Sequence, residues 1–201
     1  LKQWDYVAST DAIAPMIWLR WMDHYRKLTW DDEWSSRGIE KRSGSWGFTG
    51  NNHREPMLEV FEYMTRKKPT SVWFDNRDTP QVETRDDIML EAFNRATAEL
   101  KSRYGGDVSK LRWGDINQLR VRSMTGEDVL ARMGGPVPGT SFTVNPGSGG
   151  GHVGGGASFR MIIDFADPST SLGVYPGGQN ENPESPHYAD QIPLWATGKY
   201  V

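Results

Sequence analysis

The chain changes character near Gly134, and this change restricts its fold more than any other feature of the sequence. Before this point, apolar residues recur with the spacing of amphipathic helices. After it, glycine and proline become dense and short apolar stretches resemble strands. The pattern predicts an α+β fold, with a helical portion over residues 1–128 and a strand-and-loop portion over residues 129–201. So few strands would form a small, poorly covered sheet, and we therefore expect one compact fragment of a larger structure.

The first helix is expected over residues 10–28. Ser9, Thr10 or Asp11 can cap it, and Pro15 falls in its first turn, where a missing N–H costs least. The groups expected on its inward face are Ile13, Met16, Ile17, the apolar stem of Arg20, Trp21, His24 and Leu28. The following stretch, residues 29–52, mixes aromatic residues with glycines and is expected to be irregular.

Two more helices are predicted before residue 106. One begins near Glu55-Pro56 and runs to about Arg66, with an inward face of Met57, Leu58, Phe61 and Met64. The other follows a capping-box pattern, Thr84 with Asp87, and ends at Gly105-Gly106. Its apolar stripe consists of Ile88, Met89, Ala92, Phe93, Ala96 and Leu100. Between the two, residues 72–74 are expected to be extended.

Strands are predicted at residues 119–121, 140–144, 158–165 and 172–175. The short turn at 167–170 predicts that the last two pair antiparallel, with 158–165 as a central strand. Within that strand Arg160 and Asp164 share a face. If the face meets structure outside this chain, Arg160 is the better candidate for an ion pair there.

The closing segment is expected to end in a helix. Ser185 would cap it and Pro186 would occupy its first position, so the helix would cover residues 186–196. Its apolar face would hold Trp195, which we expect to pack onto the helices at 10–28 and 85–104.

Composition excludes several classes of protein. The net charge is −3 and the pI is about 5.8, so neither nucleic acid nor an anionic membrane is expected as the main partner. No apolar run approaches the ~20 residues of a membrane span. Leu1 opens without a signal peptide, as a mature or truncated chain would. Cysteine is absent, which excludes disulfides, thiolate nucleophiles and cysteine-bound metals within this chain.

Nine tryptophans are many for 201 residues, and they concentrate in the first quarter of the chain. They are typical of a large helix interface. The alternative is a platform that binds carbohydrate or an aromatic ligand.

No catalytic, cofactor or metal residue is predicted from spacing. The glycine-rich stretch at 147–156 lacks the Gly-Lys-Ser/Thr ending of a phosphate loop and is expected to be a plain connection. The paired acids at 75–78 and 164–167 are too few for a calcium loop and are expected to form turns. The four histidines are His24, His53, His152 and His187, and no two of them have the spacing of metal ligands. Ser158 has no Gly-x-Ser-x-Gly context.

Five stretches occur in a distinctive order: WDYVASTDAIAPMIWLRW, LRWGDINQL, GGPVPGTSFTVN, GASFRMIIDF and GGQNENPESPHYADQIPLWATGKY. Together they resemble the C-terminal part of the β chain of the penicillin acylase (penicillin amidase) family. The resemblance covers essentially the whole chain, and the last two stretches are its most specific part. Asn117 and Asn180 depart from it, standing where many members carry histidine and serine.

The resemblance implies an N-terminal nucleophile hydrolase with a four-layer αββα fold that hydrolyses a linear amide. In such zymogens a precursor cleaves itself into α and β chains, and the new β-chain N-terminal serine attacks the amide with its own α-amine as base. The implied partners are the α chain, the rest of the β chain and a small amide substrate, without nucleic acid or a membrane span. The resemblance further implies a part in antibiotic biosynthesis, calcium bound at upstream sites of the parent enzyme, and a periplasmic or extracellular location. The residues themselves do not indicate the compartment.

The resemblance assigns no catalytic residue to this chain. Leu1 cannot act as the nucleophile, and the oxyanion asparagine of the family lies upstream, so we expect an inactive C-terminal fragment, either a designed piece or a proteolytic product. Six polar residues of the closing segment are expected to be structural, with a share in shaping the acyl pocket as the alternative: Gln179, Ser185, His187, Tyr188, Asp190 and Gln191.

Overall fold

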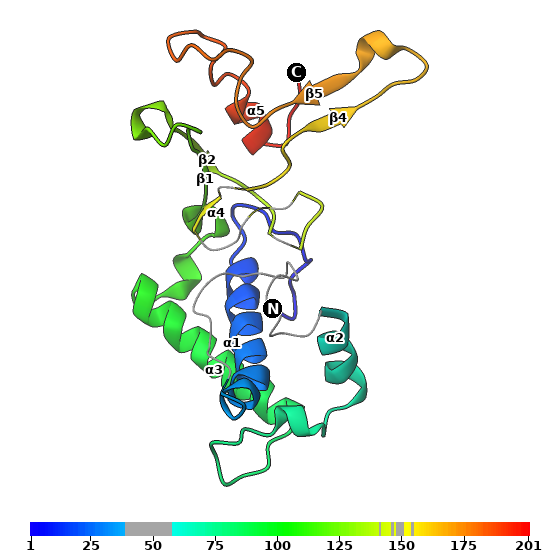
Figure 1. The fold of residues 1–201 in the computed structure, drawn as a ribbon, viewed down its shortest axis with the longest axis vertical. Coiled ribbons are helices and arrows are strands. Elements are labelled where there is room, and N and C mark those ends of the chain that lie inside the picture. Colours follow the sequence, from blue (N-terminus) through cyan, green and yellow to red (C-terminus); the bar gives the residue numbers. More distant parts are fainter. Residues whose placement is uncertain (39–57, 141, 146, 148–150, 154) are drawn as a thin grey trace. The chain divides into compact units, whose positions relative to one another are not determined.

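The computed structural model describes residues 1–38, 58–140, 142–145, 147, 151–153 and 155–201 (Figure 1). These residues form two compact units, and the fold is α+β, as predicted. Unit 1 contains Leu1 and residues 16–109, and unit 2 contains residues 2–15 and 110–201. Residues 110–128 thus group with the strand-rich part, while the division expected at residue 128 stays a prediction. None of the described helices is both long and apolar enough to span a bilayer.

Unit 1 is helical. It is built from α1 (Ala14–Ser35), α2 (Leu58–Lys67), the 3₁₀ turn η1 (Val72–Phe74) and α3 (Arg85–Tyr104). Aromatic rings dominate the core, and the Tyr25 ring lies 4.7 Å from that of Phe61 and 6.1 Å from that of Phe74. The buried core residues are Tyr25, Trp30, Phe61, Met64, Phe74, Ile88 and Ala92.

The capping box of α3 is confirmed. The Asp87 carboxylate accepts from the Thr84 backbone N–H at 2.9 Å, and Gly105 follows the helix with a positive φ. Burial along α3 follows the predicted stripe at Ile88, Ala92, Ala96 and Leu100.

Three local expectations in unit 1 are wrong. Residues 29–35 continue α1, because Thr29 and Trp30 are buried in the core and hold the extra turns against it. Residues 72–74 form a 3₁₀ turn, with the Phe74 N–H bonded to the Ser71 carbonyl at 2.9 Å, and this turn lets Phe74 reach the core. Leu58 is exposed instead of inward, and Met57 lies outside the described residues.

Unit 2 contains two small sheets. The first has the order β2-β1-β3, where β1 (Asn117–Val121) pairs antiparallel with β2 (Arg132–Pro136) and parallel with β3 (Gly151–Val153). The second is the predicted antiparallel hairpin of β4 (Arg160–Ile162) and β5 (Leu172–Val174), in which Met161 lies opposite Gly173. The remaining elements are α4 (Trp113–Ile116), α5 (Ile192–Ala196) and the 3₁₀ turns Val108–Lys110, Asp128–Leu130 and Pro168–Thr170.

Two strand predictions are wrong. β4 covers only Arg160–Ile162, so it is shorter than 158–165. Among the described residues it has one paired neighbour, β5, where a central strand has two. Residues 140–144 form no strand in the part of the chain that is described. Thr140 instead accepts hydrogen bonds from both the backbone and the side chain of Thr143, which bends the segment.

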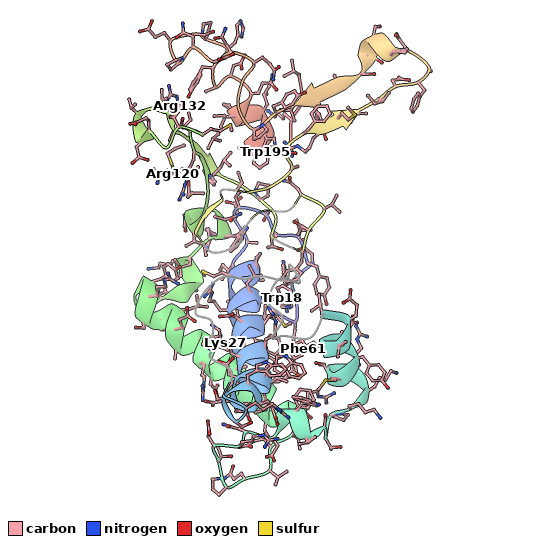
Figure 2. All side chains as sticks on the ribbon, viewed as in Figure 1. Trp18, Lys27, Phe61, Arg120, Arg132 and Trp195 are labelled. Carbon is pink, nitrogen blue, oxygen red and sulfur yellow. The ribbon has the colours of Figure 1, made fainter. Side chains whose placement is uncertain are left out.

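The helix expected at 186–196 is mostly absent. It begins at Ile192, because residues 186–191 close turns: the Tyr188 N–H bonds to the Ser185 carbonyl at 3.1 Å. Trp195 is buried, as predicted, but the core cluster that contains it consists of residues of unit 2 instead of the expected helices. Figure 2 labels Trp195 on α5. This second core consists of Leu119, Val137, Val174, Ile192, Trp195 and Ala196.

Candidate functional site

Segments far apart in sequence meet in unit 2. The Trp113 N–H donates to the Ala12 carbonyl at 2.8 Å, and the Gly114 N–H donates to the Thr10 carbonyl at 2.7 Å. The Gly139 N–H donates to the Ala8 carbonyl at 2.8 Å. Three of the stretches that carry the family resemblance are therefore joined backbone to backbone.

Gly114 makes this junction possible. A Cβ atom at this position would lie 2.9 Å from the Pro136 Cβ and 3.1 Å from the Thr10 carbonyl oxygen. Such contacts are too short for a side chain, so only glycine lets these segments approach one another this closely.

A buried polar pair fixes the loop after β2. The Trp113 indole N–H donates to the Gly139 carbonyl at 2.8 Å, and the Asn117 amide donates to the Val137 carbonyl at 2.8 Å. Both side chains are fully buried, so these bonds satisfy carbonyls that water does not reach. Asn117, where many family members carry histidine, therefore closes a loop in this chain. Its Oδ1 has no hydrogen-bond partner among the described residues.

A pocket of about 500 Å³ lies at this junction. Its described lining comes from three of the five stretches and consists of Ser9, Thr10, Gly134, Pro136, Pro138, Pro193, Ala196 and Thr197. The lining is mainly apolar with a few hydroxyl groups. None of these residue types titrates near neutral pH, so the described lining can bind an apolar group but supplies no general acid or base.

The closing segment folds back on itself beside this core. The Gln179 N–H donates to the His187 carbonyl at 2.9 Å, and the Gln191 N–H donates to the Gly177 carbonyl at 3.1 Å. A Cβ atom on Gly178 would overlap the His187 carbonyl oxygen, so the closed loop requires glycine there.

The polar residues of this segment bond mainly to nearby backbone. The Tyr188 hydroxyl donates to the Leu130 carbonyl at 2.8 Å, and the Arg132 guanidinium lies 4.7 Å from the centroid of the Tyr188 ring. The Gln191 side chain accepts from the Tyr175 N–H at 2.9 Å, and the Ser185 hydroxyl accepts from the His187 N–H at 3.2 Å. These contacts fix the course of the segment, and its structural role stays a prediction.

One histidine-carboxylate pair lies in this segment. His187 Nδ1 is 2.8 Å from the Asp190 carboxylate, but the His187 side chain is 68% exposed. A catalytic triad also needs a nucleophile within hydrogen-bond reach of the other ring nitrogen. No hydroxyl is bonded to His187 Nε2 among the described residues, so the pair is not a catalytic set as it stands.

Among the described residues, unit 1 holds the most heavily buried charge. Glu33 is 2% exposed and contacts Arg37 Nη1 and Arg77 Nε, each at 2.8 Å. Burial favours a raised pKa for Glu33, but the hydrogen bonds and charges of Arg77 and Arg37 outweigh it and leave the pKa below its usual value. Glu33 therefore stays ionised near neutral pH as a structural anion.

A polar pocket of about 380 Å³ lies on the same unit. Its described lining carries charges of both signs: His24, Lys27, Leu28, Asp31, Asp32, Asn76, Asp78 and Arg95. His24 lies on a helix face, as expected, with Nε2 2.8 Å from the Glu99 carboxylate. In the described part of the chain, no three histidine or acidic side chains lie together in a way that could hold a metal ion.

The paired acids form turns, as predicted. Asp75 accepts from the Glu83 N–H at 3.2 Å. Asp164 accepts from the Ala166 N–H at 2.8 Å, and Asp167 accepts from the Ser169 N–H at 3.1 Å. Hydrogen bonds from the Ala166 and Asp167 backbone N–H groups lower the pKa of Asp164. Hydrogen bonds from the Ser169 hydroxyl and backbone N–H lower the pKa of Asp167.

A search of known protein families matches the model described as penicillin amidase over residues 1–201. The chain belongs to the penicillin amidase family. Among its curated relatives is acyl-homoserine lactone acylase QuiP of Pseudomonas aeruginosa, which is 28% identical over a region covering 70% of this chain and 19% of the relative. The proteins of the same name from Pseudomonas putida and Pseudomonas fluorescens Pf0-1 are 28% and 27% identical, covering 78% and 70% of this chain. The matched regions span about a fifth of these relatives, at 20% and 17% of the last two.

Sequence reasoning named no pocket residue as a site residue. Ser9, Pro136 and Thr197 lie within the stretches that carry the family resemblance, but no local pattern says that they meet. His53 and residues 148–150 and 154 of the glycine-rich stretch lie outside what is described. Residues 151–153 of that stretch form β3, so the plain connection expected there is wrong at these positions.

Proposed function

We propose that this chain is the C-terminal part of the β chain of an N-terminal nucleophile amidase that hydrolyses a linear amide, with an acyl-homoserine lactone as the first substrate to test. The observation that carries the proposal is the family match over all 201 residues. The choice of substrate is supported by the names of the curated relatives.

In this proposal the reaction takes place on residues outside this chain. An N-terminal serine attacks the amide carbon with its α-amine as base, the amine leaves, and water releases the acid from the acyl-enzyme. Fixed hydrogen-bond donors stabilise the oxyanion. The lining of the 500 Å³ pocket supports a non-catalytic part for this chain, because its described residues supply no proton-transfer group.

The proposed role of unit 2 is to hold the neighbouring catalytic residues of the complete protein in position. The backbone bonds of Ala8, Thr10 and Ala12, together with the buried Trp113–Asn117 pair, rigidify the region in which the resembling stretches meet. A precisely held catalytic group needs such a supporting shell. A contribution of the pocket to acyl binding belongs to the same proposal.

The experiment compares two proteins. Residues 1–201 alone, and the complete product of the reading frame that encodes them, are each incubated with acyl-homoserine lactones of several chain lengths and with a chromogenic phenylacetyl anilide. Release of the free amine is measured. We expect turnover only by the complete product, abolished when the serine that leads its β chain is replaced by alanine. Turnover by residues 1–201 alone, or an inactive complete product on every amide tested, would contradict the proposal.

The alternative is a non-catalytic binding or assembly module that uses tryptophan-rich surfaces. Trp30, Trp113 and Trp195 are buried, and the other described tryptophans are at least partly buried, so none of those described forms an open platform. The amidase proposal is therefore favoured. Binding of the isolated chain to a glycan array would support the alternative.

A further inference from the structure

The β4–β5 hairpin exposes a dense group of large apolar side chains. Phe159, Met161, Ile162, Ile163, Leu172 and Tyr175 are each between 41% and 52% exposed. The two strands contain three residues each, and a two-stranded ribbon is marginally stable in water without a surface to pack on. A patch of this kind on one ribbon indicates an interaction surface.

The exposed groups lie on both faces of the ribbon. The strand register places Phe159, Met161 and Ile163 on one face, where the Phe159 and Tyr175 rings stack with centroids 4.9 Å apart. On the opposite face Val174 is buried in the core of unit 2, but Ile162 and Leu172 are paired farther out and stay exposed. A partner that removes all of these apolar side chains from water must therefore cover both faces of the ribbon.

The two edges of the ribbon differ. The outer edge of β5 is occupied, since the Val201 N–H donates to the Gly173 carbonyl at 2.9 Å and the Gly173 N–H donates back at 3.4 Å. Because Gly173 directs its backbone groups away from β4, the opposite residue, Met161, directs its own N–H and carbonyl away from β5. The edge of β4 is thus the one left open among the described residues.

We propose that a segment of the same polypeptide outside residues 1–201 adds a strand along β4 at Met161 and that the same part of the polypeptide covers the apolar faces of the ribbon. The matched regions span only 17–20% of the curated relatives, which leaves ample chain to do this. A second copy pairing edge to edge would bond to Met161 but would leave both faces in water, so it fits the exposed groups less well. The inference depends on the proposed function only in requiring a longer polypeptide.

The test expresses residues 1–201 and the remainder of their reading frame as two separate chains in one cell, with an affinity tag on the remainder. We expect the two to co-purify. Met161→Lys places a charge on the face of Phe159 and Ile163, which the proposal covers, and Met161→Pro removes the outward N–H without breaking a β4–β5 bond. Each should lower recovery of residues 1–201 at least tenfold. Met124→Lys is the matched control, because Met124 is fully exposed in the turn between β1 and β2.

Hydrogen exchange keeps the test independent of how the variants fold. In the wild-type pair, the Met161 amide should exchange at least a hundredfold more slowly than in residues 1–201 alone. An unprotected Met161 amide, equal recovery of Met161→Lys and Met124→Lys, or a reading frame with no further segment would overturn the proposal. A dimer of residues 1–201 that Met161→Pro dissociates would overturn it in favour of a second copy. Activity is not measured, so this proposal and the proposed function can fail separately.

Discussion

Arg160 lies over the Trp195 ring, with its guanidinium carbon 5.2 Å from the ring centroid, and it donates through Nη2 to the Trp195 carbonyl. The contact joins β4 to α5, and the Trp195 indole N–H in turn donates to the Ala157 carbonyl at 2.8 Å. The Arg160 side chain thus has partners within unit 2 itself, so an ion pair with structure outside this chain stays a prediction.

The Arg160–Trp195 contact should be measurable as a coupling energy. In a double-mutant cycle of Arg160→Gln and Trp195→Phe, we expect a coupling of about 0.5–2 kcal/mol, because a partly desolvated cation–π contact contributes in this range. Thermal melts suffice, since ~1 kcal/mol shifts Tm by about 2–4 °C at this length. Arg122→Gln, in the exposed turn after β1, should show no coupling to Trp195→Phe. A coupling near zero for Arg160 would mean that the two groups are merely adjacent.

Gly178 and Gly177 offer a matched pair of substitutions in the closing segment. Gly178→Ala should destabilise unit 2 by at least about 2 kcal/mol, because its Cβ would overlap the His187 carbonyl and force the backbone to move. Gly177→Ala meets nothing within 4 Å and should be nearly neutral. Urea unfolding followed by tryptophan fluorescence measures both. Equal stability of the two variants would show that the loop does not close as described.

Glu33 should make the stability of unit 1 depend on acid pH. Its folded pKa is lowered, so the stabilisation is fully present above the unfolded pKa of about 4.3 and is lost as the pH falls toward the folded value. We expect Glu33→Gln to be less stable than wild type at pH 7 and the difference to shrink below about pH 4. Urea unfolding at several pH values tests this. Glu62→Gln, on an exposed helix pair with Arg66, should show no comparable pH-dependent difference.

Thr84 should stabilise α3 as its N-terminal cap. Thr84→Ala removes the cap side chain and should cost about 1 kcal/mol. Thr97→Ala makes the same change inside the same helix, where alanine has the better helix propensity, and should be neutral or slightly stabilising. Circular dichroism melts of the two variants distinguish these outcomes. A larger loss for Thr97→Ala would contradict the capping role.

The parts of the fold that were predicted correctly depend on neighbours in sequence. The Thr84–Asp87 box and the glycines after α3 act within one helical turn, and the hairpin turn at 167–170 brings β4 beside β5. The errors occur where packing against residues far away in sequence determines the local structure. Thr29 and Trp30 have modest helix propensity, yet burial in the unit 1 core keeps them helical.

The junction in unit 2 could not be predicted for the same reason. Nothing near Thr10 in sequence shows that its carbonyl meets Gly114, or that the pocket lining joins Ser9 to Thr197. Likewise Trp195 was expected to be buried because of its size, but its neighbours follow from the strand pairing around Leu119 and Val174.

Unit 1 interrupts unit 2 in the sequence, since residues 16–109 separate residues 2–15 from the rest of it. During translation, the segment Ala8–Ala12 emerges from the ribosome about 100 residues before Trp113 and Gly114 emerge. At ~5–20 residues per second this delay is roughly 5–20 s. The inserted helical unit can fold as it emerges, whereas the Thr10 and Ala12 carbonyls have no partner until Trp113 and Gly114 have emerged, and the Ala8 carbonyl has none until Gly139 has followed.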